Sequence, residues 1–166
     1  MVSTTSAWTL REGFAFCAAL TAIGFLLQLS LGAIDWQWFA WPANGVALAA
    51  LLLLITGMHL SRRRIPAFRF LSTYAAAVPA LLLAVALTLV MGLTRQQPDG
   101  RWFSNMLAFW PFVLAYTYVV LILGLTILWR LHHILHPSTA PRHWRRDVPF
   151  LLNHAGLFLA LVAATL

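Results

Sequence analysis

Five apolar stretches alternate with short polar connections along this chain. Each stretch holds about twenty residues, which is the length an α-helix needs to cross the hydrocarbon core of a bilayer. The pattern predicts spans at residues 14–34, 39–60, 71–93, 106–128 and 148–166. We therefore expect an all-α integral membrane protein: a single transmembrane domain over residues 1–166, built as a bundle of about five helices.

Four prolines lie within these stretches and are compatible with helices. Pro42 and Pro149 fall in predicted first turns, where a missing amide hydrogen costs nothing. Pro79 and Pro111 fall further inside their spans, where neighbouring helices tolerate a kink.

Charge is scarce and unevenly placed. The chain is 61% hydrophobic and 9% charged, with a formal net charge of +7, and a soluble domain could not hide so much apolar surface. The two loops after spans two and four hold eight arginines: Arg62, Arg63, Arg64, Arg69, Arg130, Arg142, Arg145 and Arg146. The outer loops hold only Arg95 and Arg101. Positive loops stay cytoplasmic, so we expect a cytoplasmic N-terminus, with arginines that meet lipid headgroups rather than nucleic acid.

Both ends of the chain carry expectations. The first apolar run is long enough to span, and no small-residue cleavage site ends a shorter one, so we expect a retained helix. The last run is still apolar at Leu166, with no polar flank after it. We expect the chain to be the N-terminal part of a longer protein.

His154 is the one histidine of six that lies well inside an apolar stretch. An ionisable side chain at that depth costs about 2.5 kcal/mol or more if charged, and it usually faces other helices and has a function. Asn153 precedes it, and Gly156, Ala160 and Ala164 form a strip of small residues on which another helix could pack. Two interpretations stay open: an axial haem ligand, with Asn153 as a supporting group, or a histidine that bonds a neighbouring helix for packing.

The other candidate groups predict no catalytic or metal site. His132 and His136 share a helix face if the fourth helix continues past Trp129, but no carboxylate or cysteine completes a site. The roles of His132, His133 and His136 stay open, as does that of His59. The single cysteine, Cys17, excludes both an intrachain disulfide and a haem-attachment Cys-x-x-Cys-His motif. No carboxylate lies inside a span, which disfavours a proton pump.

Two segments resemble the ResB/CcsB-like proteins of cytochrome c biogenesis, the System II pathway. The first is Asp35-Trp-Gln-Trp-Phe-Ala-Trp-Pro, followed by a helix that ends in His59-Leu-Ser-Arg-Arg-Arg. The second, Asn153-His-Ala-Gly-Leu-Phe-Leu-Ala-Leu-Val-Ala, is similar to the family's His-x-Gly helix, whose histidine is implicated as a haem ligand near the cytoplasmic side. Spans three and four depart from the simplest members, and the family's large outer domain is not in this sequence.

The resemblance implies a multi-pass subunit of a bacterial cytoplasmic (inner) membrane that holds or moves haem for attachment to apocytochrome c outside. Its partner would be a CcsA-type haem-handling membrane protein, with which it would form part of a haem–cytochrome c lyase complex, and its haem ligand would be His154. Two alternatives stay open: a b-haem or quinone redox subunit, which needs paired histidines on facing helices, and a non-catalytic assembly or scaffold protein. The outer tryptophans Trp36, Trp38 and Trp41 predict an interfacial belt, or else a platform for a flat apolar ligand.

Overall fold

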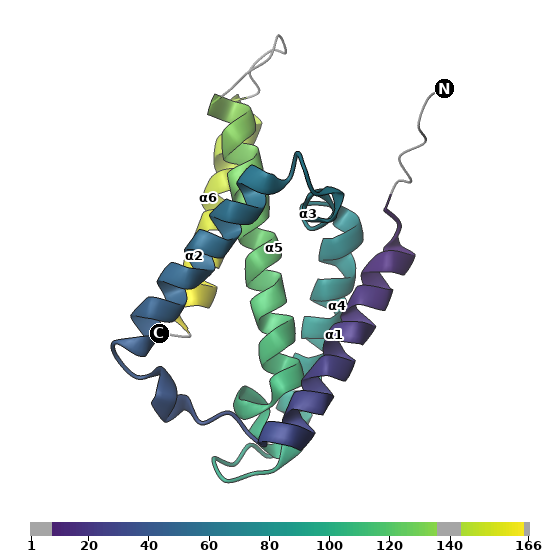
Figure 1. Ribbon diagram of the computed structural model, residues 1–166, viewed down its shortest axis with the longest axis vertical. Helices are drawn as coiled ribbons and strands as arrows, with labels where there is room; N and C mark the ends of the chain where they lie inside the picture. The colour runs from purple at the N-terminus through teal and green to yellow at the C-terminus, as the bar shows by residue number, and fades with distance from the viewer. Residues whose placement is uncertain (1–7, 136–143, 165–166) are drawn as a thin grey trace. The chain divides into compact units, whose positions relative to one another are not determined.

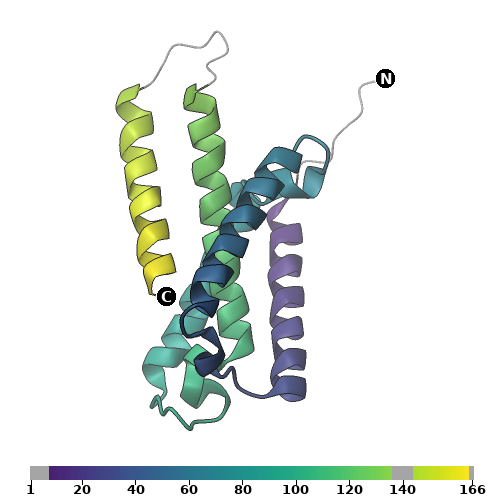
Figure 2. The same ribbon diagram turned by 60° about the vertical axis from the view of Figure 1, so that its left-hand side comes forward.

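The computed structural model describes residues 8–135 and 144–164, and these residues form helices joined by short turns. They fall into two compact units, Met1–Ile34 with Thr73–Tyr116, and Asp35–Ser72 with Thr117–Leu166. Helix α5, Trp110–Leu135, contributes its first residues, through Tyr116, to one unit and its remainder, from Thr117, to the other. Figures 1 and 2 show the helices from two directions.

The first unit contains α1 (Leu10–Leu31), α4 (Tyr74–Leu93), the 3₁₀ segment η2 (Trp102–Ala108) and the start of α5. Helix α1 begins after Thr9, whose backbone N–H donates to the Glu12 carboxylate over 2.8 Å. Helices α1 and α4 run parallel, because Gly13 near the start of α1 lies against Ala75 and Pro79 near the start of α4. A Cβ added at Gly13 would overlap the Ala75 carbonyl oxygen, so the two backbones touch where a glycine allows it.

Side-chain hydrogen bonds join the ends of the helices in this unit. Gln28, a buried polar side chain, accepts from the backbone N–H of Trp110 over 3.1 Å and so satisfies a free donor at the first residue of α5. The Trp110 indole N–H donates to the Gly32 carbonyl over 3.0 Å. The end of α1 and the beginning of α5 are therefore held at one level.

The second unit contains the 3₁₀ turn η1 (Trp36–Phe39), α2 (Ala43–Ser61), the short α3 (Pro66–Phe70), the part of α5 from Thr117 onward, and α6 (Trp144–Ala163). Both views show α6 alongside the C-terminal half of α5 (Figures 1 and 2). Gly124 of α5 makes the close approach possible. A Cβ there would lie 2.7 Å from the Ile55 side chain and 3.1 Å from the Phe158 ring.

Within residues 8–135 and 144–164, four helical segments are long and apolar enough to cross a membrane: Leu10–Leu31, Ala43–Ser61, Tyr74–Leu93 and Trp102–Leu135. The expectation of an all-α, multi-pass membrane protein is confirmed at this level. The fifth predicted stretch is also helical, but its apolar part, Asp147–Ala163, is shorter than the other four.

The predicted boundaries shift most in the fourth and fifth stretches. Helix α5 begins at Trp110 rather than 106 and continues to Leu135, well past Trp129, so Pro111 lies in a first turn. Helix α6 begins at Trp144, four residues before the predicted start, and Pro149 therefore lies inside it. The placement of these two prolines was wrong for different reasons. Polar residues extend the beginning of α6 before its apolar core, which puts Pro149 inside the helix. A 3₁₀ segment and an extended residue occupy the beginning of the fourth apolar stretch, so α5 starts just before Pro111, and hydropathy alone detects neither change.

Candidate functional site

His154 lies on the face of α6 that packs within its unit. The buried Val162 and the half-buried Phe158 follow it at four-residue intervals, which places the three side chains on one stripe of the helix. This stripe meets a helix–helix seam at Phe158, and the inference that His154 itself points toward such a seam stays a prediction. The small residue at this seam is Gly124 of α5, which receives Phe158.

The small-residue strip of α6 is a different surface. Gly156, Ala160 and Ala164 are exposed, and a Cβ at Gly156 would meet no atom within 4 Å among the described residues. Among the described residues no helix packs on this strip, so the expectation that another helix could pack there stays a prediction. Bulky side chains on α6 fit against a glycine on α5, whereas the sequence suggested the reverse.

The imidazole of His154 has two defined neighbours, both on residue Phe150. Its Nδ1 lies 2.8 Å from the Phe150 carbonyl oxygen, and its ring stacks on the Phe150 ring with centroids 3.8 Å apart and planes inclined by 25°. A carbonyl oxygen only accepts, so this contact requires the proton on Nδ1. In the neutral ring, Nε2 then carries the lone pair, and no hydrogen bond to Nε2 occurs within residues 8–135 and 144–164.

An ion pair lies one turn before Phe150, and two turns before His154, toward the beginning of α6. The Arg130 guanidinium of α5 pairs with the Asp147 carboxylate of α6, and both side chains are largely withdrawn from the surface. The same guanidinium carbon lies 5.2 Å from the centre of the Phe150 ring. Arg130 Nε is buried and finds no hydrogen-bond partner in the described part of the chain. Asp147, Arg130, Phe150 and His154 thus form a continuous series of contacts across two helices.

Asn153, the predicted supporting group of His154, points elsewhere. Its side chain is exposed and makes no hydrogen bond to His154 among the described residues. The residue that contacts the His154 ring is Phe150, one turn earlier on α6. The signal that could have identified Phe150 is the four-residue spacing, which places an aromatic ring and a carbonyl on the histidine's own face.

Three other histidines, all within the described residues, lie near the ends of α2 and α5 in this unit. His59 at the end of α2 and His132 near the end of α5 have ring centroids 5.7 Å apart, and His133 stacks on Trp129 at 4.7 Å. Burial, and secondarily the charge of Arg63, lowers the pKa of the nearby Arg62 guanidinium. His136 and His143 lie outside the described residues. No group of three potential metal-ligating side chains forms within the described ranges. The roles of His132, His133 and His136 stay open.

Aromatic side chains form a separate cluster in the first unit. Phe109 is buried and lies 5.2–6.4 Å, between ring centroids, from its three neighbours Phe25, Trp102 and Phe103. The Gln96 side chain ties this segment together by donating to Phe103 O over 3.0 Å and accepting from Met106 N–H over 3.0 Å. In the other unit, Trp38 and Trp41 are 79% and 81% exposed, as an interfacial belt requires.

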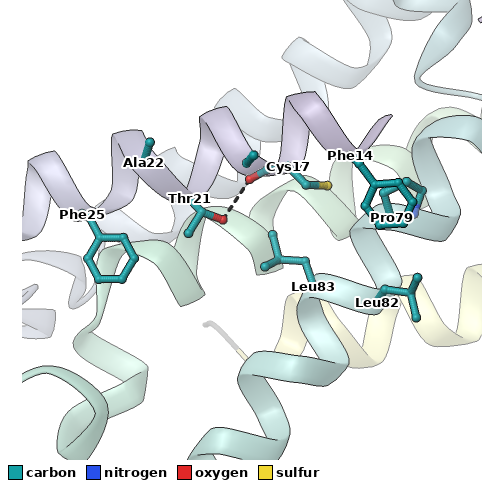
Figure 3. Close-up of a pocket in the computed structure, with 9 residues that line it drawn as sticks. Phe14, Cys17, Thr21, Ala22, Phe25, Pro79, Leu82 and Leu83 are labelled. Carbon is teal, nitrogen blue, oxygen red and sulfur yellow. Dashed lines mark hydrogen bonds between the residues drawn. The ribbon is translucent and has the colours of Figure 1, made fainter. Parts of the chain in front are cut away.

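The first unit also contains an open apolar cavity of about 600 Å³ between α1 and α4 (Figure 3). The residues that line it include Phe14, Cys17, Phe25, Pro79 and Leu83. The hydroxyl of Thr21, its most polar lining group, donates to the Cys17 carbonyl over 2.8 Å and is therefore already satisfied. The cavity offers apolar contact and no directed polar chemistry.

Comparison of the chain with protein-family models, curated proteins and solved structures finds no match. The functional argument therefore depends on the residues and their geometry.

Proposed function

We propose that this chain is the membrane-embedded part of a ResB/CcsB-like haem-handling subunit of cytochrome c biogenesis, with His154 as an axial haem ligand. The observation that carries the proposal is the state of the His154 ring. Its Nδ1–H is used by the Phe150 carbonyl, which leaves the Nε2 lone pair on a half-buried imidazole inside an apolar helix. Histidine ligands of metals are typically held in this way, with the second ring nitrogen donating to a carbonyl or carboxylate.

The surroundings of His154 suit a large apolar cofactor. Leu157, which is exposed and lies three residues beyond the histidine, is near the same face of α6 and supplies apolar contact. Haem would contribute the iron that Nε2 coordinates. The chain's own task is to present that nitrogen at a fixed depth and to keep water away from it.

The direction of the helices supports a cytoplasmic N-terminus and five crossings. In the second unit, contacts place the end of α2, the end of α5 and the beginning of α6 at one level, through His59–His132 and Arg130–Asp147. Alternating crossings require this arrangement, with α6 as the returning fifth span. The arginines that follow α2 and α5 then lie on the cytoplasmic side.

On this topology His154 lies seven residues beyond Asp147, roughly 10 Å into the membrane from its cytoplasmic edge. This is the side on which haem would enter from the cytoplasm. We infer that the protein acts in a bacterial cytoplasmic membrane with a CcsA-type partner, and that apocytochrome c receives the haem on the outer side.

The proposal is tested by expressing the chain in haem-sufficient membranes, alone and with a CcsA-type partner, and recording reduced-minus-oxidised spectra after mild extraction. We expect a haem signal that His154→Ala abolishes while protein yield is unchanged. His133→Ala is the matched control, because His133 is an exposed histidine at the end of α5 and should leave the signal intact.

Each other outcome favours a different function. A low-spin haem that turns over with quinol would support a redox subunit, and the His59–His132 pair would then be the next ligand candidate. A haem signal that survives His154→Ala would refute the assignment of the ligand. If no haem is found under either condition, the scaffold interpretation replaces this one.

A further inference from the structure

We propose that the Arg130–Asp147 ion pair positions His154 and, acting through the Phe150 ring, fixes its imidazole with the proton on Nδ1 and Nε2 as the ligating atom. Arg130 is thus a positioning residue on a different helix from the histidine. The inference rests on the proposed haem-handling function for its biological meaning, but the state of the imidazole can be measured without haem.

The hydrogen bond of His154 is insecure by itself. The Phe150 carbonyl that accepts from Nδ1 is also the acceptor that α-helix geometry assigns to the backbone N–H of His154. A side chain that shares an acceptor in this way can readily adopt another rotamer or the opposite tautomer. A further restraint is needed if the ring is to present one nitrogen consistently.

The Phe150 ring supplies that restraint from one side. It stacks on the imidazole at 3.8 Å, so a change of the histidine χ1 rotamer would cost the stacking contact, while the Phe150 carbonyl selects which ring edge faces it. The phenyl ring is itself fixed from another helix, because the Arg130 guanidinium carbon lies 5.2 Å from its centre. The imidazole is therefore held by a ring that α5 holds in turn.

The ion pair restrains the position of the Arg130 side chain. Its pairing with Asp147 joins α5 to the first part of α6, and the side chains of both residues are mostly shielded, at 32% and 17% exposure. A shielded charge pair at a helix junction is costly to break and defines one register of the two helices. Sliding α6 along α5 would separate the pair and move Phe150 away from the guanidinium.

The tautomer of His154 tests this directly on haem-free protein. We would label histidine with ¹⁵N, record spectra in alkaline buffer where imidazoles are neutral, and assign the His154 signals by their loss in His154→Gln. In the unaltered chain we expect the Nδ1–H form to predominate roughly fivefold to tenfold, the factor that one ordinary hydrogen bond supplies. Equal populations, or a predominant Nε2–H form, would overturn the proposal.

Two variants then separate the restraints. R130Q/D147N removes both charges and leaves no unpaired ion in the membrane, so the helices can still associate through their amides. F150L keeps the backbone carbonyl and the ion pair but removes the ring. We expect both variants to lose most of the tautomer preference, whereas R63Q/D99N, which removes the same charges from exposed positions, keeps it. Retention of the preference in R130Q/D147N or in F150L would overturn the inference.

The result is independent of the haem experiment. A fixed tautomer that depends on Arg130, in a chain that binds no haem, would refute the proposed function and leave the positioning intact. Conversely, haem bound through His154 in a chain whose tautomer ignores R130Q/D147N would refute the positioning and leave the function intact.

Discussion

Of the glycines in this chain, Gly13 has the least space for a Cβ atom. A Cβ at this position would overlap the Ala75 carbonyl and lie 2.8 Å from the Pro79 ring, and both neighbours belong to the facing helix α4. Backbone atoms cannot move aside as a flexible side chain can. The parallel packing of α1 on α4 therefore depends on the absence of a side chain here.

We expect Gly13→Ala to destabilise the first unit by about 1–3 kcal/mol, because overpacking forces the two helices apart. Thermal unfolding in detergent measures the effect. Gly57→Ala is the matched control, since no atom lies within 4 Å of a Cβ at Gly57 and alanine favours the helix by up to about 1 kcal/mol. Equal stability of the two variants would show that α1 and α4 do not touch at Gly13.

At His154, the sequence and the structure contribute different facts. The depth of the histidine follows from the apolar stretch around it and was predictable. Its tautomer, its Phe150 neighbour and the exposure of Asn153 were not, because they depend on side-chain rotamers. The sequence places both Asn153 and Phe150 near His154 along the chain but does not show which of the two contacts its ring.

Between helices, single polar side chains join the helix ends by hydrogen bonds. Gln28 on α1 reaches a residue 82 positions away and supplies the acceptor for the first N–H of α5. The first N–H groups of any helix lack partners within that helix. In an apolar medium, a donor without a partner costs far more than it would in water, which makes this contact a joint between the two helices.

We expect Gln28→Leu to destabilise the α1–α5 junction by about 1–3 kcal/mol, the cost of leaving a buried donor unsatisfied. Unfolding in detergent reports the free energy, and faster hydrogen exchange at the Trp110 amide reports the location. Gln97→Leu provides the comparison because the Gln97 side chain is exposed. Unchanged exchange at Trp110 in Gln28→Leu would contradict the role given to this hydrogen bond.

For the whole molecule, the arginine asymmetry predicts the orientation in the membrane. Cys17 is the only cysteine, so a Cys17→Ser background allows single reporter thiols to be placed at will. Arg63→Cys should be protected from a membrane-impermeant thiol reagent in intact cells, and Asp99→Cys should be labelled, because the two residues lie at opposite ends of the predicted spans. Both sites should react after the membrane is opened.

The same design tests α6 as the fifth crossing. Helix α6 holds 20 residues, as many as α4, but its first turn carries Asp147, so its crossing calls for a separate test. A reporter fused after Leu166 should face the outer side. A cytoplasmic reporter would mean that α6 does not cross, and labelling of Arg63→Cys in intact cells would mean that the orientation is reversed.

The sequence by itself determined the helices and their expected direction across the membrane. Twenty apolar residues in lipid have few alternatives to a helix, because each backbone group must be satisfied within its own segment, and the arginine loops predict the sidedness. These are local properties of the chain. They required no knowledge of which helix lies beside which.

Only the tertiary structure decided the partners. Lipid is as apolar as a leucine side chain, so hydropathy cannot select the face on which one membrane helix packs against another. Shape and sparse polar contacts make that choice. Gly124 receives Phe158, Gly13 lies against Ala75, and Arg130 finds Asp147 on the next helix. These contacts gave His154 its surroundings, and they could not be read from the order of residues alone.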